Sequence, residues 1–311
     1  MLEELGLKLI KLDLPFRLNH VNCFMAEGEN GWKIIDAGVH DNKTAIKWGK
    51  ELAEKTITDI LVTHYHPDHF GYVGGLQQRT GARVSMPEID AKTVETIWED
   101  DFIVKLQDTY SLLGIPNDIA RKMGSFYQGY ISIVTPYPKV EHYLQEGEKI
   151  LLGKYEYEVI FTPGHSNGLI TFYNKERNVL LSTDHILPRI TPNIAYWFHG
   201  NPNPLADFLQ SLEKIKKLDV DFVIPSHGKP FYGANERIEE IINHHNDRLA
   251  ETLESINYGG TAYEVFLKLF GEIDIHGTRS AMGETLSHLE FLIEKGECKR
   301  ELKNGQWWYY I

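Results

Sequence analysis

Three histidines and an aspartate lie within six positions of the sequence, in the stretch THYHPDH: His64, His66, Asp68 and His69. A folded domain gains little stability from such a cluster in one loop. Neutral imidazole nitrogens and aspartate oxygens are, however, ligands that divalent metals accept. In an extended segment His64 and His66 point the same way and can bind one ion, while Asp68 and His69, beyond Pro67, can face a second. The cluster therefore predicts a metal site.

Three further stretches each place one candidate ligand after a β-rich run of the sequence. His165 occurs in TPGHS, Asp184 in STDH and His227 in PSHG. A sheet holds the ends of its strands rigidly, so loops at those ends can converge on one site. A single His-x-His pair is weak evidence, but the seven residues together favour a metal site over incidental histidines in polar loops.

The motifs THYHPDH, TPGHS, STDH and PSHG resemble, in order and approximate spacing, those of the metallo-β-lactamase superfamily, and the resemblance covers about residues 1 to 232. It implies an α/β fold, an αββα sandwich with a dinuclear site in the cleft between its two sheets. It also implies the ligands: His64, His66 and His165 for the first metal, Asp68, His69 and His227 for the second, and Asp184 as the bridge.

Two metal ions held in this way would supply a nucleophile. Metal binding lowers the pKa of water to roughly 7, so a bridging hydroxide can attack at neutral pH while the second ion polarises the substrate. Asp68 would also have a catalytic role, because it could orient the hydroxide. The ligands are all nitrogen and oxygen, which favours two Zn²⁺ and would also suit Mn²⁺ or Fe²⁺. The oxygen-reducing diiron relatives have glutamate at the position of His66, so the resemblance favours hydrolysis over redox chemistry.

Residues 1–233 are predicted to form one catalytic domain that alternates strands and helices. Asn30-Gly31 predicts a hairpin turn between two strands. A helix is expected from about residue 43 to 54, and the strand DILVT then leads into the first motif. Between about 87 and 143 the pattern becomes helical and aromatic, with Trp98 and Tyr130, and predicts a helical insertion that could form a lid.

Residues 234–311 are predicted to form a second, winged-helix domain. A long amphipathic helix comes first. Thr261 and Glu264 then form a capping-box pattern that opens a short helix, and a third helix is expected from about Arg279 to Lys295. The tail predicts a hairpin that turns at Asn304-Gly305. A subgroup of the superfamily is similar over the whole chain, and it includes poorly characterised bacterial hydrolases and a mitochondrial endoribonuclease.

The substrate is the open question. Secreted β-lactamases have a signal peptide and typically a thiolate ligand, whereas Asp184 matches the non-lactamase members of the superfamily. The stretch THYHPDHFGYVGG is similar to glyoxalase II, a thioester hydrolase, although glyoxalase II ends in a helical glutathione-binding domain. We therefore expect hydrolysis of a small ester, thioester or lactone, with cleavage of single-stranded RNA as the alternative.

The charge of the C-terminal segment bears on the RNA alternative. Residues 235–311 contain eight Lys and Arg against fourteen Asp and Glu, which argues against DNA as a partner. In the hairpin, however, Lys299, Arg300 and Lys303 occur near Trp307 and Trp308. Cations beside aromatic rings can hold single strands, and the same residues could equally be an aromatic strand packed on its own domain beside solvated cations.

The loop that follows Asp184 contains four aromatic residues in a row, namely Tyr196, Trp197, Phe198 and His199. They could form an apolar pocket for an acyl or aryl group, or they could cover the core. Asp36 could hydrogen-bond a ligand imidazole or merely cap a turn. His20 and His185 could support the site, but packed histidines are commoner, so neither is included among the ligands.

Composition sets outer limits on location and partners. The formal net charge of −12 makes nucleic acid a poor default partner, so a small-molecule substrate is expected instead. Cys23 and Cys298 are the only cysteines and lie far apart in the sequence, which fits a reducing cytoplasm. No apolar run approaches the roughly 20 residues needed to cross a bilayer, so no membrane partner is expected. The start, MLEELGLKLIKLDLPF, is a poor secretory signal. The terminal WWYYI leaves more aromatic surface than a hairpin can cover, so it is expected to contact the first domain or a second copy in a homodimer.

Overall fold

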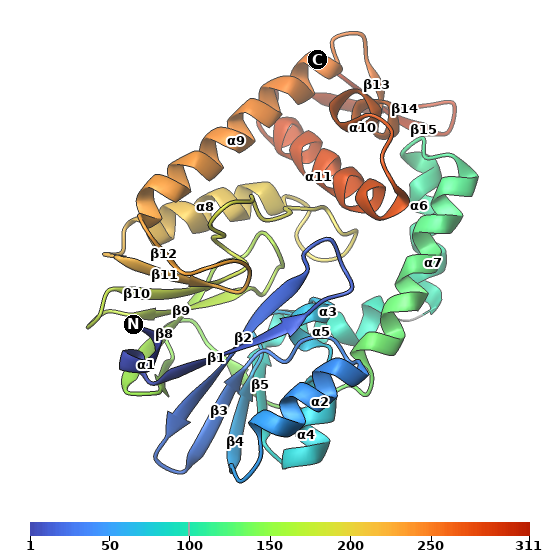
Figure 1. Cartoon of the computed structure of the whole chain (residues 1–311). Coiled ribbons are helices and arrows are strands. Elements are labelled where there is room, and N and C mark those ends of the chain that lie inside the picture. Colours follow the sequence, from blue (N-terminus) through green and yellow to red (C-terminus); the bar gives the residue numbers. More distant parts are fainter. Residues whose placement is uncertain (99) are drawn as a thin grey trace.

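Two six-stranded sheets form the centre of the molecule (Figure 1). The structure, a computed structural model, describes residues 1–98 and 100–311, and for residues 100, 101, 103 and 126–128 it describes the backbone alone. The first sheet has the order β1 (Leu7–Asp13), β2 (His20–Gly28), β3 (Gly31–Ile35), β4 (Ile57–Leu61), β5 (Arg83–Pro87), β6 (Val140–Leu144). The second has the order β12 (Phe231–Tyr232), β11 (Phe222–Pro225), β10 (Val179–Thr183), β9 (Ile170–Asn174), β8 (Tyr155–Phe161), β7 (Lys149–Leu152). The prediction of a mixed α/β fold with two sheets is confirmed.

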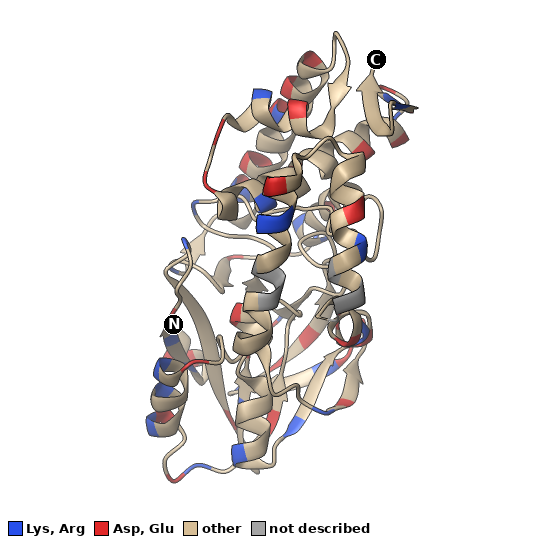
Figure 2. Ribbon diagram, turned by 90° about the vertical axis from the view of Figure 1, so that its right-hand side faces the viewer, with Lys and Arg blue, Asp and Glu red and all other residues tan. Residues whose placement is uncertain are grey.

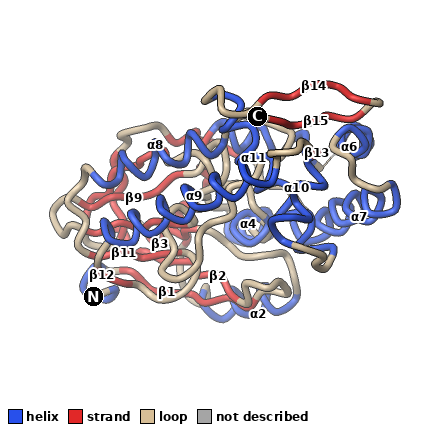
Figure 3. The backbone as a smooth tube through the Cα atoms, turned by 90° about the horizontal axis from the view of Figure 1, so that it is seen from above, coloured by secondary structure: helices blue, strands red, loops and turns tan. Residues whose placement is uncertain are grey.

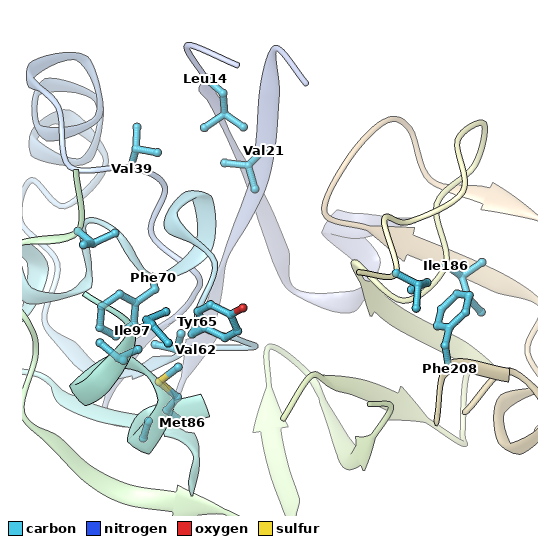
Figure 4. Close-up of a cluster of buried hydrophobic side chains, with 14 of the residues drawn as sticks. Leu14, Val21, Val39, Val62, Tyr65, Phe70, Met86, Ile97, Ile186 and Phe208 are labelled. Carbon is cyan, nitrogen blue, oxygen red and sulfur yellow. The ribbon is translucent and has the colours of Figure 1, made fainter. Parts of the chain in front are cut away.

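Each sheet is covered on both faces, which explains why its central strands are almost wholly apolar. In β2, Phe24 and Ala26 join a cluster between the sheets, while Cys23 and Met25 join the cluster under the helices. Strands β9 and β10 alternate in the same way between the two clusters. Figure 4 shows part of the outer cluster, with Phe70 and its neighbours apart from the group of Ile186 and Phe208.

Parallel pairs in both sheets place several strand ends at one edge of the sandwich. Strands β3 to β6 pair in parallel, and so do β10 and β11. The connections include α2 (Asn42–Glu51), α3 (Pro67–Phe70), α4 (Val73–Thr80) and α8 (Pro204–Lys216), with a short α1 (Leu2–Leu5) at the start. The hairpin predicted at Asn30-Gly31 joins β2 and β3 as expected.

Three helices separate β5 from β6 at the predicted insertion: α5 (Glu88–Ile97), α6 (Asp100–Leu112) and α7 (Asn117–Val134). The helical pattern of the sequence is continuous from about 91 to 115, whereas the structure divides it between α5 and α6. The last residues of the range 87–143 lie in strand β6, because Val140 and its neighbours pair with β5 at the edge of the first sheet.

The C-terminal segment contains α9 (Ala234–Ser255), β13 (Gly260–Thr261), α10 (Ala262–Phe270), α11 (Ile275–Glu294), β14 (Lys299–Lys303) and β15 (Gln306–Tyr310), with the three strands in the order β13-β15-β14. Thr261 and Glu264 form the predicted capping box, and the hairpin turns at Asn304-Gly305. Helix α11 begins four residues before the predicted start at Arg279. Asp274 caps it instead, since its Oδ1 accepts a hydrogen bond from the Gly277 amide at 2.8 Å.

The C-terminal segment packs against the first part of the chain. Helix α11 lies beside α7 and α8, and β15 lies beside α6, as the view from above shows (Figure 3). The Tyr263 amide donates to the Leu113 carbonyl at 3.1 Å. Tyr309 is fully buried, so the first part of the chain and α10 supply much of the cover that the aromatic tail requires. In the described residues, no helix is both long enough and apolar enough to cross a membrane.

Candidate metal centre

The seven predicted ligands come together where four strands end. His64 and His66 follow β4, and Asp68 and His69 lie in the short helix α3 just beyond them. His165, Asp184 and His227 follow β8, β10 and β11 of the other sheet. Backbone hydrogen bonds join the two sheets at this edge, from the Ile170 amide to the Thr63 carbonyl (3.2 Å) and from the Asn22 amide to the Ser226 carbonyl (2.7 Å).

The ligand atoms form two sets. His64, His66 and His165 place one ring nitrogen each within 4.8 Å of one another, and Asp68, His69 and His227 do the same with a nitrogen or a carboxylate oxygen. His66 Nδ1 and His165 Nε2 are 2.9 Å apart. These two sets contain the residues that the sequence resemblance implied, and a third group of His64, His69 and Asp184 connects them; which residue binds which ion stays a prediction.

Asp184 lies between the sets. Its Oδ1 is 3.5 Å from His69 Nε2 and 3.3 Å from His227 Nε2, while its Oδ2 is 3.4 Å from His165 Nε2. One carboxylate oxygen therefore faces each set. Thr183, directly before it, has a positive φ of 49°, an uncommon conformation for a β-branched residue, and its hydroxyl donates to the Ile170 carbonyl at 2.9 Å.

Three of the histidine rings are held by a hydrogen bond from Nδ1, which leaves Nε2 facing the centre of the site. His69 Nδ1 donates to Asp36 Oδ2 (2.8 Å), His165 Nδ1 to the Asn193 carbonyl (2.9 Å) and His227 Nδ1 to the His20 carbonyl (2.7 Å). Such partners fix the tautomer of metal-binding histidines.

The inward-facing atoms fit a metal rather than a protein network. The Nε2 atoms of His64, His69 and His227 and Oδ1 of Asp184 are buried, and none has a hydrogen-bond partner among the described residues. Buried polar atoms without partners are rare and costly in proteins. Four such atoms that face the same site are expected where residues coordinate cations.

Asp36 organises one side of the site. It is buried and accepts hydrogen bonds from the Thr63 amide (2.9 Å) and the Thr63 hydroxyl (2.8 Å), in addition to the bond from His69. The Thr63 oxygen in turn lies 3.0 Å from His64 Nδ1. Of the two interpretations considered for Asp36, the geometry supports the bond to a ligand imidazole. Asp36 has a positive φ of 59°, a conformation that aspartate tolerates, and its carboxylate contacts Thr63 and His69 of the THYHPDH motif.

The charges of the site also favour cations. Burial lowers the pKa of His64 and His66 well below the usual value, so both rings are neutral, which is the metal-binding form. Burial opposes protonation of His69 and His227 too, but Asp184 and the other nearby carboxylates raise the pKa of both, in His227 to about 10. The second set thus holds excess negative charge, which protons or metal ions can neutralise.

Asp90 supports the site and was not predicted. It is buried in α5, and burial raises its pKa to about 6, so it is largely ionised at neutral pH. Its carboxylate accepts from the Tyr65 amide (3.0 Å), the Ser166 hydroxyl (2.8 Å) and the Gly168 amide (2.7 Å). A Cβ at Gly168 would lie 2.6 Å from Asp90 Oδ1, so the close approach requires glycine. Asp90 therefore ties the two histidine loops of the first set together.

Replacing Asp90 with asparagine is expected to lower the free energy of unfolding by about 1–3 kcal/mol, because an amide would turn a donor toward at least one of the three buried donors. Metal affinity should fall roughly 10-fold as the two loops loosen. Chemical denaturation and metal titration would measure both effects, with Asp207→Asn on the half-buried start of α8 as the control. Unchanged metal affinity would show that Asp90 does not position the loops.

A cavity of about 540 Å³ opens onto the ligands, with His66, Asp68, His165 and Asp184 in its wall. Trp197 and His199 line it, whereas Tyr196 and Phe198 pack against the main hydrophobic cluster. The run of aromatic residues thus contributes both to the cavity wall and to the cover of the core. Trp98 and Tyr130 of the insertion line the cavity as well, as a lid would.

The two histidines left out of the ligand set have different surroundings. His20 supports the site through its backbone carbonyl, which accepts from His227, and its Nε2 lies 3.1 Å from the Gly228 amide. His185 is buried against Phe208, with ring centroids 5.3 Å apart, and burial lowers its pKa to about 3. Neither ring belongs to any of the three groups of possible metal ligands found among the described residues.

Known proteins are similar to both parts of this chain. The model of the metallo-beta-lactamase superfamily matches residues 17–227, and the model of the metallo-beta-lactamase-like C-terminal domain matches residues 249–310. A probable metallo-hydrolase of Bacillus subtilis, YqjP, is 24% identical over 296 residues, 91% of each chain. A crystal structure of a metallo-beta-lactamase family protein from Thermus thermophilus superimposes with a TM-score of 0.85 at 30% identity, covering 98% of both chains.

A hydroxyacylglutathione hydrolase of Pseudomonas savastanoi is 25% identical over 225 residues, which are 72% of this chain and 66% of that protein. The superfamily model alone covers more than half of the present chain. The chain therefore belongs to the metallo-beta-lactamase superfamily and is a metal-dependent hydrolase.

Proposed function

We propose that the protein is a dinuclear zinc hydrolase that cleaves a small ester, thioester or lactone. The observation that carries the proposal is the convergence of buried atoms that have no hydrogen-bond partner among the described residues, namely Nε2 of His64, His69 and His227 and Oδ1 of Asp184, whose carboxylate lies between the two sets. Manganese or iron would suit the same nitrogen and oxygen ligands.

The proposed assignment gives His64, His66 and His165 to one ion, Asp68, His69 and His227 to the other, and Asp184 to both. Two divalent cations would supply a water whose pKa is lowered to about 7, and an electrophile for the substrate oxygen.

Asp68 is placed to orient that water. Burial opposes its ionisation, but His69 and His227 lower its pKa to about 2, so it is a carboxylate at neutral pH. Its Oδ2 lies 3.3 Å from His227 Nε2, and the residue borders the cavity. A carboxylate at this place can accept a hydrogen bond from the attacking water and hold its lone pair toward the substrate.

The size and lining of the cavity support a small substrate. About 540 Å³ falls within the range of ordinary small-molecule sites. Phe16, Trp98, Tyr130 and Trp197 provide apolar walls for an acyl or aryl group. The name of the similar hydroxyacylglutathione hydrolases describes an acyl group on glutathione, which supports the same class of substrate.

Cleavage of single-stranded RNA is the second candidate, with the C-terminal segment as a winged helix. The observation in its favour is the β14–β15 hairpin, where Arg300 lies 4.6 Å over Trp307 and Lys303 lies 5.0 Å over Trp308. These ring faces are already covered by cations of the same hairpin, however. Basic and acidic residues are also interspersed on the face that Figure 2 shows. We therefore rank RNA below a small substrate.

Metal content and a substrate panel test the proposal. Protein purified without chelator is expected to contain about two metal ions per chain, zinc foremost, by elemental analysis. Thioesters, lactones, phosphodiesters and labelled RNA would then be compared with wild type, His66→Ala and the control His142→Ala, in strand β6 and paired with Glu148. Metal at background in active protein would refute the dinuclear assignment. Activity on RNA alone, falling steeply with added salt, would reverse the ranking.

A further inference from the structure

The wall of the cavity that faces the metal ligands comes partly from the C-terminal segment. Asp274, His276, Gly277, Arg279 and Ser280, at the start of α11, line it together with residues of the first part of the chain. We propose that Arg279 binds an anionic oxygen group of the substrate, a carboxylate or a phosphate, so that the enzyme selects esters or thioesters with a negative charge away from the scissile bond. The inference rests on the proposed function and names the substrate class of that site.

The side chain of Trp197 lies between Arg279 and the proposed metal centre. The ring centroids of Trp197 and His66 are 6.2 Å apart, and the Arg279 guanidinium lies 4.6 Å from the ring centroid of the same Trp197. A substrate whose reactive carbonyl is at the ligands can therefore lie along Trp197 and reach Arg279 with a tail of a few bonds.

Aromatic side chains hold the guanidinium in place. Arg279 is half-buried and lies over Trp197 and, at 5.5 Å, over Tyr130. Tyr130 in turn contacts Phe16 and Trp98, each with ring centroids 6.1 Å apart. The planar fork of N–H groups of a guanidinium matches a carboxylate or phosphate. Little rotamer freedom is then lost on binding.

The charges around the cavity favour an anion. Arg17 lines it as a second cation, while burial lowers the pKa of the nearby His199 to about 4, so that ring is neutral. Outside the proposed ligands, Asp274 is the acid among the described lining residues, and its Oδ1 already accepts from the Gly277 amide. Two arginines at one cavity stand out in a chain with a formal net charge of −12.

The packing of α11 fixes where Arg279 stands. Gly283, one turn further along the helix, is on the same face as Arg279. Its carbonyl accepts from the Tyr196 amide at 2.9 Å, and a Cβ at this position would lie 2.7 Å from Ala195 Cβ. The glycine thus lets the loop that carries Trp197 approach the helix closely. Arg279 and Trp197 are consequently positioned as one unit, although they are far apart in sequence.

Paired substrates test the proposal. We would measure kcat and KM for thioesters of a dicarboxylic acid with one free carboxylate, for a phosphate-bearing counterpart, and for the neutral methyl-ester counterpart. Wild type should prefer the anionic members. Arg279→Met should raise KM for its preferred anion by about 10- to 100-fold, the loss expected for a hydrogen bond between charged groups, and should change KM for the neutral member less than ~3-fold. Arg279→Lys should fall between.

Arg248→Met is the matched control, because Arg248 lies 4.6 Å over Phe270 within the C-terminal segment and does not line the cavity. It should leave the preference for the anion unchanged. An equal rise of KM for charged and neutral members in Arg279→Met, or no preference in wild type, would overturn the proposal while leaving the hydrolase assignment intact.

A binding measurement separates this inference from the proposed function. Non-hydrolysable amides of the same acids, charged and neutral, would be titrated into metal-loaded protein while tryptophan fluorescence is recorded. The charged amide should bind wild type more tightly than Arg279→Met, and the neutral amide should not distinguish them. If wild type hydrolyses no member of the panel, the proposed function fails, and these titrations still decide the role of Arg279.

Discussion

Asp184→Asn is expected to lower kcat/KM by roughly 10³-fold or more, because one change disturbs both proposed metal sites and the charge they stabilise. The carboxylate oxygens of Asp184 face opposite sets, with Oδ1 3.3 Å from His227 and Oδ2 3.4 Å from His165. An amide keeps one oxygen and places an NH₂ group against the other set. Metal content should therefore fall below two ions per chain in the same preparation.

Folding should survive this substitution. The sheets bury their apolar residues in clusters on both faces, and Asp184 lies in the loop beyond β10. The change is isosteric, so the chain should still unfold in one cooperative transition, with a melting temperature lowered by the loss of bound metal and equal to that of wild type when both are measured without metal to within a few degrees (about 4 °C). Steady-state kinetics, elemental analysis and thermal unfolding would be run together, with Asp207→Asn as the control. Near-normal turnover by Asp184→Asn would show that Asp184 is not the bridge.

The candidate ligands, which the structure brings together, could be picked out because residues that bind metals form short local motifs in the sequence. His64 and His66 are two residues apart, and each later ligand follows an apolar strand within a short motif. Local signals also sufficed for the Asn30-Gly31 hairpin and for the capping box of Thr261, since both are determined by residues within four positions of one another.

The groups that hold the ligands could not be predicted in the same way. Asp90 acts through backbone amides of Tyr65 and Gly168, and His165 is oriented by the backbone carbonyl of Asn193. Backbone donors and acceptors are present at nearly every residue, so the sequence contains no sign of which ones will be used. The one available hint was a carboxylate at Asp90 between apolar positions of a helix, and it becomes meaningful only when burial is known.

The residues that line the cavity could not be predicted either, because their positions depend on the path of the backbone and on packing between distant segments. Trp197 and Phe198 are adjacent and both aromatic, yet one lines the cavity and the other packs in the core. Phe198 has a positive φ of 64° and lies in a bend, and neither residue type predicts this conformation. The contribution of Arg279 likewise depends on packing between segments that are far apart in the sequence.

Deletion of residues 235–311 is expected to cause loss of soluble protein. Helix α9 covers α8, where Phe208 and Leu212 are fully buried in the same cluster as Ile238 and Ile241. Exposing one such side chain costs about 1.5–3 kcal/mol, and removing α9 to β15 exposes several at once. Since a domain is typically stable by only about 5–15 kcal/mol, the truncated chain should aggregate. Soluble yield, size-exclusion chromatography and light scattering would measure this.

Tyr258→Ser is the control for the deletion, because Tyr258 is 96% exposed and should tolerate the change. Even a soluble truncated chain should lose activity on a small substrate, since Arg279 and its neighbours form one wall of the cavity and Gly283 supports the loop of Trp197. A truncated, monodisperse and fully active monomer would contradict both the structural role and the proposed substrate site. The C-terminal segment would then be free for a separate recognition role, and its hairpin of Arg300, Lys303 and tryptophans would make single-stranded RNA the leading candidate.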